Sequence, residues 1–214
     1  MLILGHRGDR QKFDDNSIKG ISSAFERGAD GVEIDVHFKP GKGIYLVHPY
    51  LHDPMKVYPK LVEVFEKFRD KGLLQIEIKF LEIKGLETLK KLIKRYNVSN
   101  YVLTSSIFPM LRYISEVFPK SKINLLSTQL IEEWWTYDFG NYFLFSYLKL
   151  AGANGIDTGY PDFWTKKRVD YFHNYGVRTS GHLATVSKEE LENALSCGLD
   201  TCTADNLDIL KWRK

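Results

Sequence analysis

Residues 31–48 read GVEIDVHFKPGKGIYLVH. Two apolar runs that suit β-strands, 31–37 and 44–48, are separated here by only six residues, and these include a Pro-Gly pair. Parallel strands need a crossover of about a dozen residues, so the two runs must form an antiparallel pair. The stretch therefore predicts a β-hairpin whose second strand returns beside the first.

Outside the hairpin, short apolar strands alternate with segments of helical period. The predicted strands are 2–5, 31–37, 44–48, 73–79, 101–104, 122–127, 154–157, 177–183 and 199–203. The helical stripes lie in 16–28 (with Asn16 as N-cap), 61–68, 86–93, 111–118, 164–175 and 187–197, with a final turn from 206. Without the return strand of the hairpin, eight strands remain, and each is followed by a helix. This pattern predicts an α/β protein, a (β/α)₈ TIM barrel with an extra antiparallel hairpin strand after strand 2. The main alternative, an open doubly wound sheet, is disfavoured because no glycine-rich phosphate loop follows the first strand.

Composition limits the broad class of the protein. A chain of 214 residues with 43% hydrophobic and 27% charged residues can bury one substantial core, so we expect a single barrel domain over 1–214 with little or no insertion. No apolar run approaches the ~18 residues of a membrane span. The first strand begins at once, which leaves no room for a leader peptide, and Cys197 and Cys202 are too few for a disulfide framework. We therefore expect a cytoplasmic protein.

The net charge of +3 is mild, and acidic residues are interleaved with the lysines between 56 and 95. This mixture is typical of solvated helix faces, so we expect no nucleic-acid partner. The charge is compatible with a small anionic substrate.

The chemically active side chains occur where strands end, which is where the active sites of such barrels gather. They are His6, Arg7, Glu33, Asp35, His48, Glu77 and Lys79. The three carboxylates can hold a hard divalent cation through oxygen ligands. The two histidines can divide the proton transfers, and the arginine and lysine can neutralise charge on a phosphorane-like transition state. These are the parts needed for metal-assisted attack on a phosphodiester.

The hairpin also predicts a local geometry. If its turn centres on Gly41-Lys42, Asp35 lies directly opposite His48, with Cβ atoms ~4.5–5.5 Å apart. A bulge in the Pro-Gly turn would shift this pairing by one residue. Glu33, two residues before Asp35, would share that face. Carboxylates and an imidazole on one inward face need partners or a ligand, because an apolar core would not tolerate them.

Over most of its length the chain resembles the glycerophosphodiester phosphodiesterase family. The shared motifs are His6-Arg7-Gly8, Asp15-Asn16-Ser17, Gly28-Ala29-Asp30, Glu33-Ile34-Asp35-Val36, His48, Ile76-Glu77-Ile78-Lys79 and the stretch from Gly198 to Asp205. The resemblance implies a metal-dependent barrel of glycerol and lipid metabolism that cleaves glycerophosphodiesters to glycerol 3-phosphate and an alcohol. It implies that the metal (Mg²⁺ or Ca²⁺, with Mn²⁺ as another candidate) binds Glu33, Asp35 and Glu77. His6 and His48 would be the acid–base pair, with Arg7 and Lys79 on the phosphate.

The chain departs from the family pattern at four places. Pro49 replaces the Asp that follows the second histidine, and Asp15 replaces a Glu. The penultimate strand lacks a Trp-Thr-Val-Asn stretch and offers His182 instead, and the segment between His48 and Glu77 has room for little beyond one helix. Without the missing Asp, we predict that Asp35 holds the His48 imidazole from across the hairpin.

Two other readings of the same barrel stay open. One is a phospholipase that cleaves lysophospholipids or inositol phospholipids through a cyclic phosphate, and the other is a catalytically weak phosphodiester-binding protein. The aromatic segment 134–147 predicts either a helix that packs on its neighbours or a patch for lipid or a partner subunit. We expect the His52-Asp53 pair to lie on a surface loop, and His173 and His182 have no partner visible in sequence.

Overall fold

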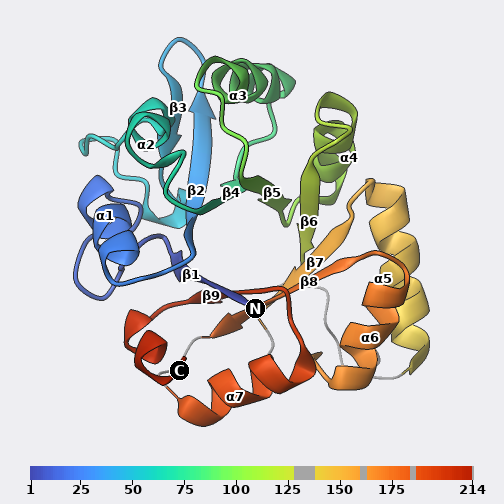
Figure 1. Cartoon of the computed structure of the whole chain (residues 1–214). Coiled ribbons are helices and arrows are strands. Elements are labelled where there is room, and N and C mark those ends of the chain that lie inside the picture. Colours follow the sequence, from blue (N-terminus) through green and yellow to red (C-terminus); the bar gives the residue numbers. More distant parts are fainter. Residues whose placement is uncertain (128–137, 160–162, 184–186, 214) are drawn as a thin grey trace.

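Parallel strands form a ring in the computed structural model, and helices surround the ring (Figure 1). The structure describes residues 1–127, 138–159, 163–183 and 187–213. Within these ranges the strands are β1 (Leu2–His6), β2 (Gly31–Lys39), β3 (Gly43–Leu46), β4 (Leu73–Ile78), β5 (Tyr101–Ser105), β6 (Lys122–Leu126), β7 (Gly155–Thr158), β8 (Arg178–Leu183) and β9 (Thr201–Ala204). All the strands predicted from the sequence are present, with shifts of one or two residues at their ends.

The strand order confirms the barrel. The sheet runs β1-β9-β8-β7-β6-β5-β4-β2-β3, and a further pairing of β1 with β2 closes the ring. The pairs around this ring are parallel, whereas β3 is antiparallel to β2 and lies outside it. Eight parallel strands therefore make the barrel, and the hairpin adds the ninth.

Most of the connections between parallel strands carry a helix. The described helices are α1 (Ile18–Glu26), α2 (Leu61–Phe68), α3 (Ile83–Arg95), α4 (Phe108–Val117), α5 (Asp138–Ala151), α6 (Lys166–Asn174) and α7 (Lys188–Cys197), with 3₁₀ turns η1 (Pro49–Leu51) and η4 (Leu207–Trp212). Each α-helix packs apolar side chains on the barrel, as α2 does with Leu61, Val64, Phe65 and Phe68. The core therefore lies between the ring of strands and the ring of helices, which leaves the end of the barrel to polar residues.

The start of α1 differs from the prediction. Ser17, not Asn16, caps this helix, because the Ser17 side chain accepts a hydrogen bond from the N–H of Gly20. Asn16 has φ +59°, a left-handed conformation that Asn tolerates better than most residues, and its side chain turns into the barrel. The residue predicted as a cap therefore belongs to the polar end of the barrel.

The register of the hairpin is also one residue away from the prediction. Lys39 pairs with Gly43, and Val36 pairs with Leu46, so the position opposite Asp35 is Val47 and not His48. The reason is the turn. Pro40 and Gly41 (φ +76°) form a tight turn closed by a Lys42 N–H to Lys39 O bond, and one more residue then precedes the paired strand.

The aromatic segment 134–147 lies partly outside the described residues, which exclude Trp134, Trp135 and Tyr137. Its described part is helical within α5. The Tyr147 ring lies 4.1 Å from that of Phe108, which agrees with packing on a neighbour, while 65% of Tyr142 is exposed. Among the described residues no helix has the length and apolarity needed to cross a membrane.

Candidate active site

The strand register brings the predicted side chains together at the carboxyl end of the barrel. His6 of β1 lies beside Glu33 of β2, and Asp35 of β2 lies beside Glu77 of β4. A cavity of about 460 Å³ opens at this end. Its lining includes His6, Arg7, Glu33, His48, Glu77 and Lys79, so six of the seven predicted site residues face one space, and Asp35 lies buried beside them.

Glu33, Asp35 and Glu77 form an acidic triad. One oxygen from each lies within 4.8 Å of the other two, and all three residues are at least 94% buried. Burial, followed by the charge of Asp35, raises the pKa of Glu33 well above its usual range, and burial raises the pKa of Glu77 to about 7. Glu33 Oε1 is buried without a hydrogen-bond partner among the described residues. The triad therefore carries negative charge that its protein neighbours satisfy only in part.

Two cations lie against the triad. Arg7 Nε is 2.9 Å from Asp35 Oδ2, and Lys79 Nζ is 3.5 Å from Asp35 Oδ1 while it also contacts Glu77. Although burial opposes it, the charge of Asp35 raises the pKa of Arg7, and the charges of Glu77 and Asp35 raise the pKa of Lys79, so both stay protonated. Arg7 also pairs with Asp15, at 2.9 Å. Both side chains reach the cavity, as predicted, but the neighbouring carboxylates neutralise part of their positive charge.

The backbone turn after β1 determines the orientation of Arg7. Arg7 has φ +58° and Gly8 φ +87°, so the chain turns sharply at the end of the strand. A side chain at Gly8 would meet the backbone of Gly20 at 2.7 Å. The glycine therefore lets α1 pack close to the turn, and the Arg7 N–H is left to donate to Glu33 Oε2 at 3.1 Å.

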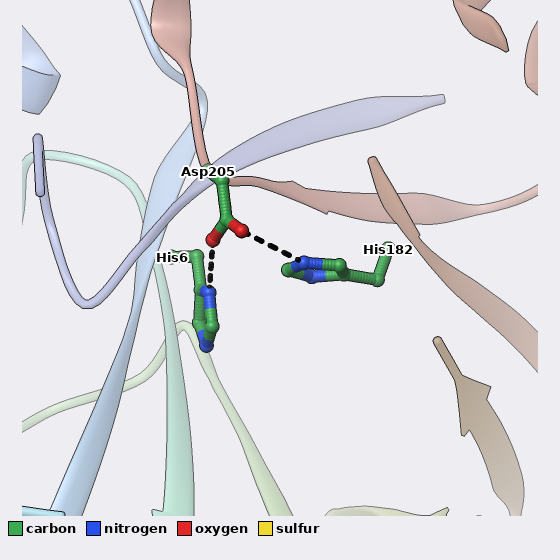
Figure 2. A group of neighbouring side chains, drawn as sticks. All are labelled: His6, His182 and Asp205. Carbon is green, nitrogen blue, oxygen red and sulfur yellow. Dashed lines mark hydrogen bonds and ion pairs between the residues drawn. The ribbon is translucent and has the colours of Figure 1, made fainter. Parts of the chain in front are cut away.

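The His6 imidazole is held by Asp205, which follows β9 (Figure 2). His6 Nδ1 lies 2.5 Å from Asp205 Oδ1, while His6 Nε2 faces Glu33 Oε2 at 3.7 Å. A carboxylate accepts, so Nδ1 carries the proton and Nε2 presents its lone pair to the triad. Burial, the largest effect, lowers the pKa of His6 despite the opposing bond from Asp205. A neutral imidazole with a free Nε2 is suited to accept a proton.

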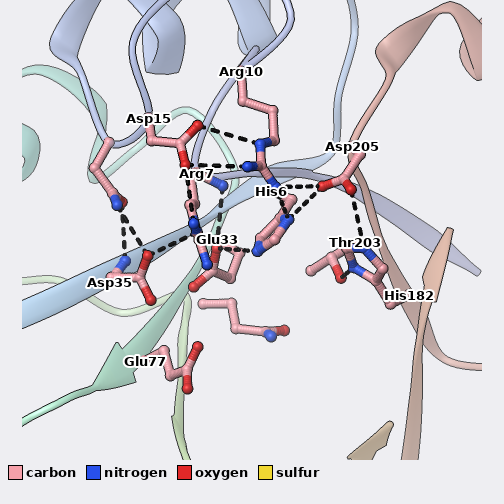
Figure 3. Close-up of polar contacts among 12 residues, drawn as sticks. His6, Arg7, Arg10, Asp15, Glu33, Asp35, Glu77, His182, Thr203 and Asp205 are labelled. Carbon is pink, nitrogen blue, oxygen red and sulfur yellow. Dashed lines mark hydrogen bonds and ion pairs between the residues drawn. The ribbon is translucent and has the colours of Figure 1, made fainter. Parts of the chain in front are cut away.

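His182 belongs to the same cluster, which the sequence did not reveal (Figure 3). Its Nε2 lies 3.4 Å from Asp205 Oδ2, its Nδ1 lies 2.9 Å from Thr203 Oγ1, and its ring meets that of His6 edge to face at 4.8 Å. His182 is close to the end of β8 and Asp205 follows β9. Their places at strand ends were the available signal, and only the closed ring shows that these ends meet β1.

His48 lies at the cavity, but the prediction that Asp35 holds its imidazole is wrong. Asp35 is engaged by Asn16, Arg7 and Lys79. The one-residue shift of the hairpin places His48 beyond β3, as N-cap of η1, where Nδ1 accepts the backbone N–H of Tyr50 at 3.4 Å. With Nδ1 as acceptor, the neutral ring carries its proton on Nε2. Burial lowers the pKa of His48.

The far wall of the cavity contains a fourth carboxylate. Asp157 of β7 is 98% buried, and Gln75 Nε2 donates to it at 2.8 Å. Burial raises the pKa of Asp157 to about 6. This pair could not be recognised from the sequence, because a lone Asp or Gln on a strand is not a motif.

His52 and His173 lie elsewhere. His52 and Asp53 are exposed, as predicted, and His52 stacks on Tyr58 at 5.7 Å. His173 Nε2 contacts Asp200, at 3.1 Å, a residue that precedes β9 and is therefore at the opposite end of the barrel from Asp205. Neither histidine is among the residues that line the cavity.

Comparison with known proteins places this site in a family. Residues 6–39, which hold His6, Arg7, Glu33 and Asp35, match the sequence model of the glycerophosphoryl diester phosphodiesterase family. The chain is 31% identical over 169 residues to a glycerophosphodiester phosphodiesterase of Caldanaerobacter subterraneus subsp. tengcongensis, which covers 62% of this chain and 70% of that protein.

Solved structures share the fold at lower identity. A glycerophosphodiester phosphodiesterase from Thermotoga maritima is 20% identical with a TM-score of 0.78 and covers 100% of this chain and 98% of that one. A phosphodiesterase from Oleispira antarctica, solved with the product sn-glycerol-3-phosphate, is 14% identical with a TM-score of 0.81 and covers 100% and 96%. With the curated relative matched over more than two thirds of its own length, the chain belongs to the glycerophosphodiester phosphodiesterase family.

Proposed function

We propose that this protein hydrolyses glycerophosphodiesters to glycerol 3-phosphate and an alcohol, with a divalent cation and two histidines as the working parts. The observation that carries the proposal is the juxtaposition of the acidic triad with the free Nε2 of His6 in one cavity. Family membership supports the reaction class, and the Oleispira antarctica neighbour binds the same product.

The residues of the triad fit a hard cation. Three buried carboxylates face two cations, Arg7 and Lys79, and Glu33 Oε1 has no hydrogen-bond donor, so an oxygen-ligated divalent ion would relieve the remaining charge. Glu33, Asp35 and Glu77 would hold Mg²⁺, Ca²⁺ or Mn²⁺. When bound, the ion supplies Lewis-acid polarisation of the phosphate.

The hydrogen bonds of the two imidazoles suggest how they divide the work. His6 donates from Nδ1 to Asp205, so its Nε2 can take a proton from the attacking water. His48, once protonated, can supply its Nε2 proton to the leaving alcohol and return to the neutral imidazole, whose Nδ1 accepts from the backbone. Lys79 and Arg7 balance the charge that develops on the phosphate oxygens.

The test is a product assay. Purified protein would be incubated with glycerophosphocholine, glycerophosphoethanolamine and glycerophosphoglycerol, each with Mg²⁺, Ca²⁺, Mn²⁺ or EDTA, and glycerol 3-phosphate would be measured. We expect release with at least one cation and none with EDTA. No turnover of any of these diesters under any cation would contradict the substrate class.

The rim of the cavity favours a second candidate substrate. Tyr50 and Ile107 line it, Tyr50 is 88% exposed, and Leu51 is 52% exposed beside Tyr50. This apolar rim suits a lysophospholipid, whose cleavage on this barrel could pass through a cyclic phosphate. Phosphorus NMR of the products would separate a persistent cyclic ester from an open monoester.

We also propose a cytoplasmic location, which rests on the sequence pattern.

A further inference from the structure

We propose that His182 is a positioning residue, which holds Asp205 and through it keeps His6 turned toward the acidic triad. The proposal rests on the base role proposed above for His6. It concerns a side chain on the penultimate strand, where the sequence departs from the Trp-Thr-Val-Asn stretch of the family it resembles.

The two oxygens of Asp205 are divided between two imidazoles. Oδ1 accepts from His6 Nδ1 at 2.5 Å, and Oδ2 faces His182 Nε2 at 3.4 Å (Figure 2). Although burial opposes it, the bonds from His182 and then His6 lower the pKa of Asp205 well below its usual range. The carboxylate therefore stays ionised, and its plane is defined from both sides.

A second contact, with Thr203, holds the His182 ring in place. Its Nδ1 lies 2.9 Å from Thr203 Oγ1, and the two residues are register partners across β8 and β9. The edge of one imidazole packs against the face of the other, with an angle of 83° between His6 and His182. This contact limits rotation of the His6 ring, which Asp205 anchors at Nδ1.

A nearby cation shares the Asp205 carboxylate with the two imidazoles. Arg10 Nη1 lies 2.9 Å from Asp205 Oδ1 and 3.1 Å from His6 Nδ1, so it competes with His6 for the same oxygen. A guanidinium binds both oxygens of a carboxylate when both are available. Arg10 is also bound to Asp15, through Nε and Nη2 at 3.2 Å each, so it reaches Asp205 through Nη1, and His182 contacts the other oxygen of the carboxylate.

A matched pair of variants separates this role from simple packing. His182→Phe keeps a ring of similar shape but has no N–H, whereas His182→Gln keeps an N–H donor for Asp205. Thermal unfolding confirms that each variant is folded, and His182→Ala replaces the Phe variant if that one is not.

The first readout needs no activity. In protein labelled with ¹⁵N-histidine, the Nδ1–H proton of His6 should give a slowly exchanging NMR signal that His6→Ala and Asp205→Asn remove. We expect His182→Gln to retain this signal and His182→Phe to lose it. A signal unchanged in His182→Phe would overturn the proposal.

The second readout is a kinetic cycle. We expect His182→Phe to lower kcat ~10–100-fold with KM unchanged, and His182→Gln to stay near wild type. In an Asp205→Asn background, His182→Phe should cause no further loss. An equal loss in both backgrounds, or a raised KM with unchanged kcat, would mean that His182 acts on the fold or on the substrate directly. If wild type cleaves no glycerophosphodiester, the proposed function fails, while the NMR signal still decides the role of His182.

Discussion

The side chain of Asn16 forms two hydrogen bonds with Asp35. Its Oδ1 accepts the backbone N–H of Asp35 at 3.0 Å, and its Nδ2 donates to Asp35 Oδ2 at 3.0 Å. Asn16 also occupies the left-handed region, at φ +59°. One residue thus aligns the central carboxylate of the triad and tolerates the backbone conformation that the position requires.

We expect Asn16→Ala to lower the free energy of unfolding by about 2–4 kcal/mol, since it removes two buried hydrogen bonds and leaves a β-carbon in the left-handed region. Asn97 shares the left-handed conformation, at φ +52°, but is exposed and has no side-chain hydrogen bond recorded in the described structure. Asn97→Ala is therefore the matched control and should cost about 1 kcal/mol. Urea unfolding measures the free energy of unfolding of both variants. Equal losses would show that the hydrogen bonds to Asp35 add nothing to stability.

Removal of one triad carboxylate should separate metal binding from stability. Burial raises the pKa of Glu33, so its charge is a cost to the metal-free fold, and Glu33→Gln should unfold at the same or a higher temperature without metal. The gain in Tm on addition of Mn²⁺, Mg²⁺ or Ca²⁺ should shrink in the variant, and excess cation should partly restore activity. Glu192→Gln, at an exposed position on α7, is the control. A full metal-induced gain in Glu33→Gln would remove Glu33 from the ligands.

A carboxylate at position 49 should change the titration of His48. Burial lowers the pKa of this imidazole, and an adjacent anion favours the protonated form, so Pro49→Asp should retain activity and move the pH–rate limb of His48 to higher pH. Pro54→Asp introduces the same charge in an exposed part of the same loop and should leave the profile unchanged. If the profile does not move and His48→Ala is nearly as active as wild type, His48 carries no proton in the reaction.

Asp157 should make the fold less stable as pH rises. Its pKa is raised from 3.8 to about 6 by burial, so the folded state binds this proton more tightly than the unfolded state does. The free energy of unfolding therefore falls between about pH 4 and pH 6, and the full penalty is present above that window. Asp157→Asn should be more stable than wild type at pH 7.5 by on the order of 1–3 kcal/mol. The gain should disappear near pH 4. Asp170→Asn, at an exposed site on α6, should show no such dependence.

The barrel could be predicted because strand and helix periods are local properties of the sequence, and the short 38–43 connection left the second and third strands no choice but to pair antiparallel. The register of the hairpin could not be predicted in the same way. Whether one or two residues follow the Pro40-Gly41 turn depends on backbone angles, and this shift of one residue moved His48 off the position opposite Asp35.

The site could be predicted where its residues lie close in sequence or match family motifs, as for Glu33, Asp35 and His6. Asp205 lies in a stretch similar to the family's, but nothing in the sequence connects it or His182 to His6, because both are separated from His6 by most of the chain and meet it only where β8 and β9 close the ring beside β1. The role of Asn16 could not be predicted, because Asn serves equally well as a helix cap and as a left-handed residue, and the sequence does not distinguish the two.

The release of glycerol 3-phosphate from glycerophosphodiesters tests the proposed chemistry most directly, when wild type, His6→Ala and His48→Ala are compared at saturating cation. We expect turnover by wild type, its loss with EDTA, and a fall of ~10²–10⁴-fold in each histidine variant that excess cation does not reverse, because these residues transfer protons and do not hold the metal. Turnover that survives EDTA, or histidine variants restored by added cation, would contradict this division between the acidic triad and the two imidazoles.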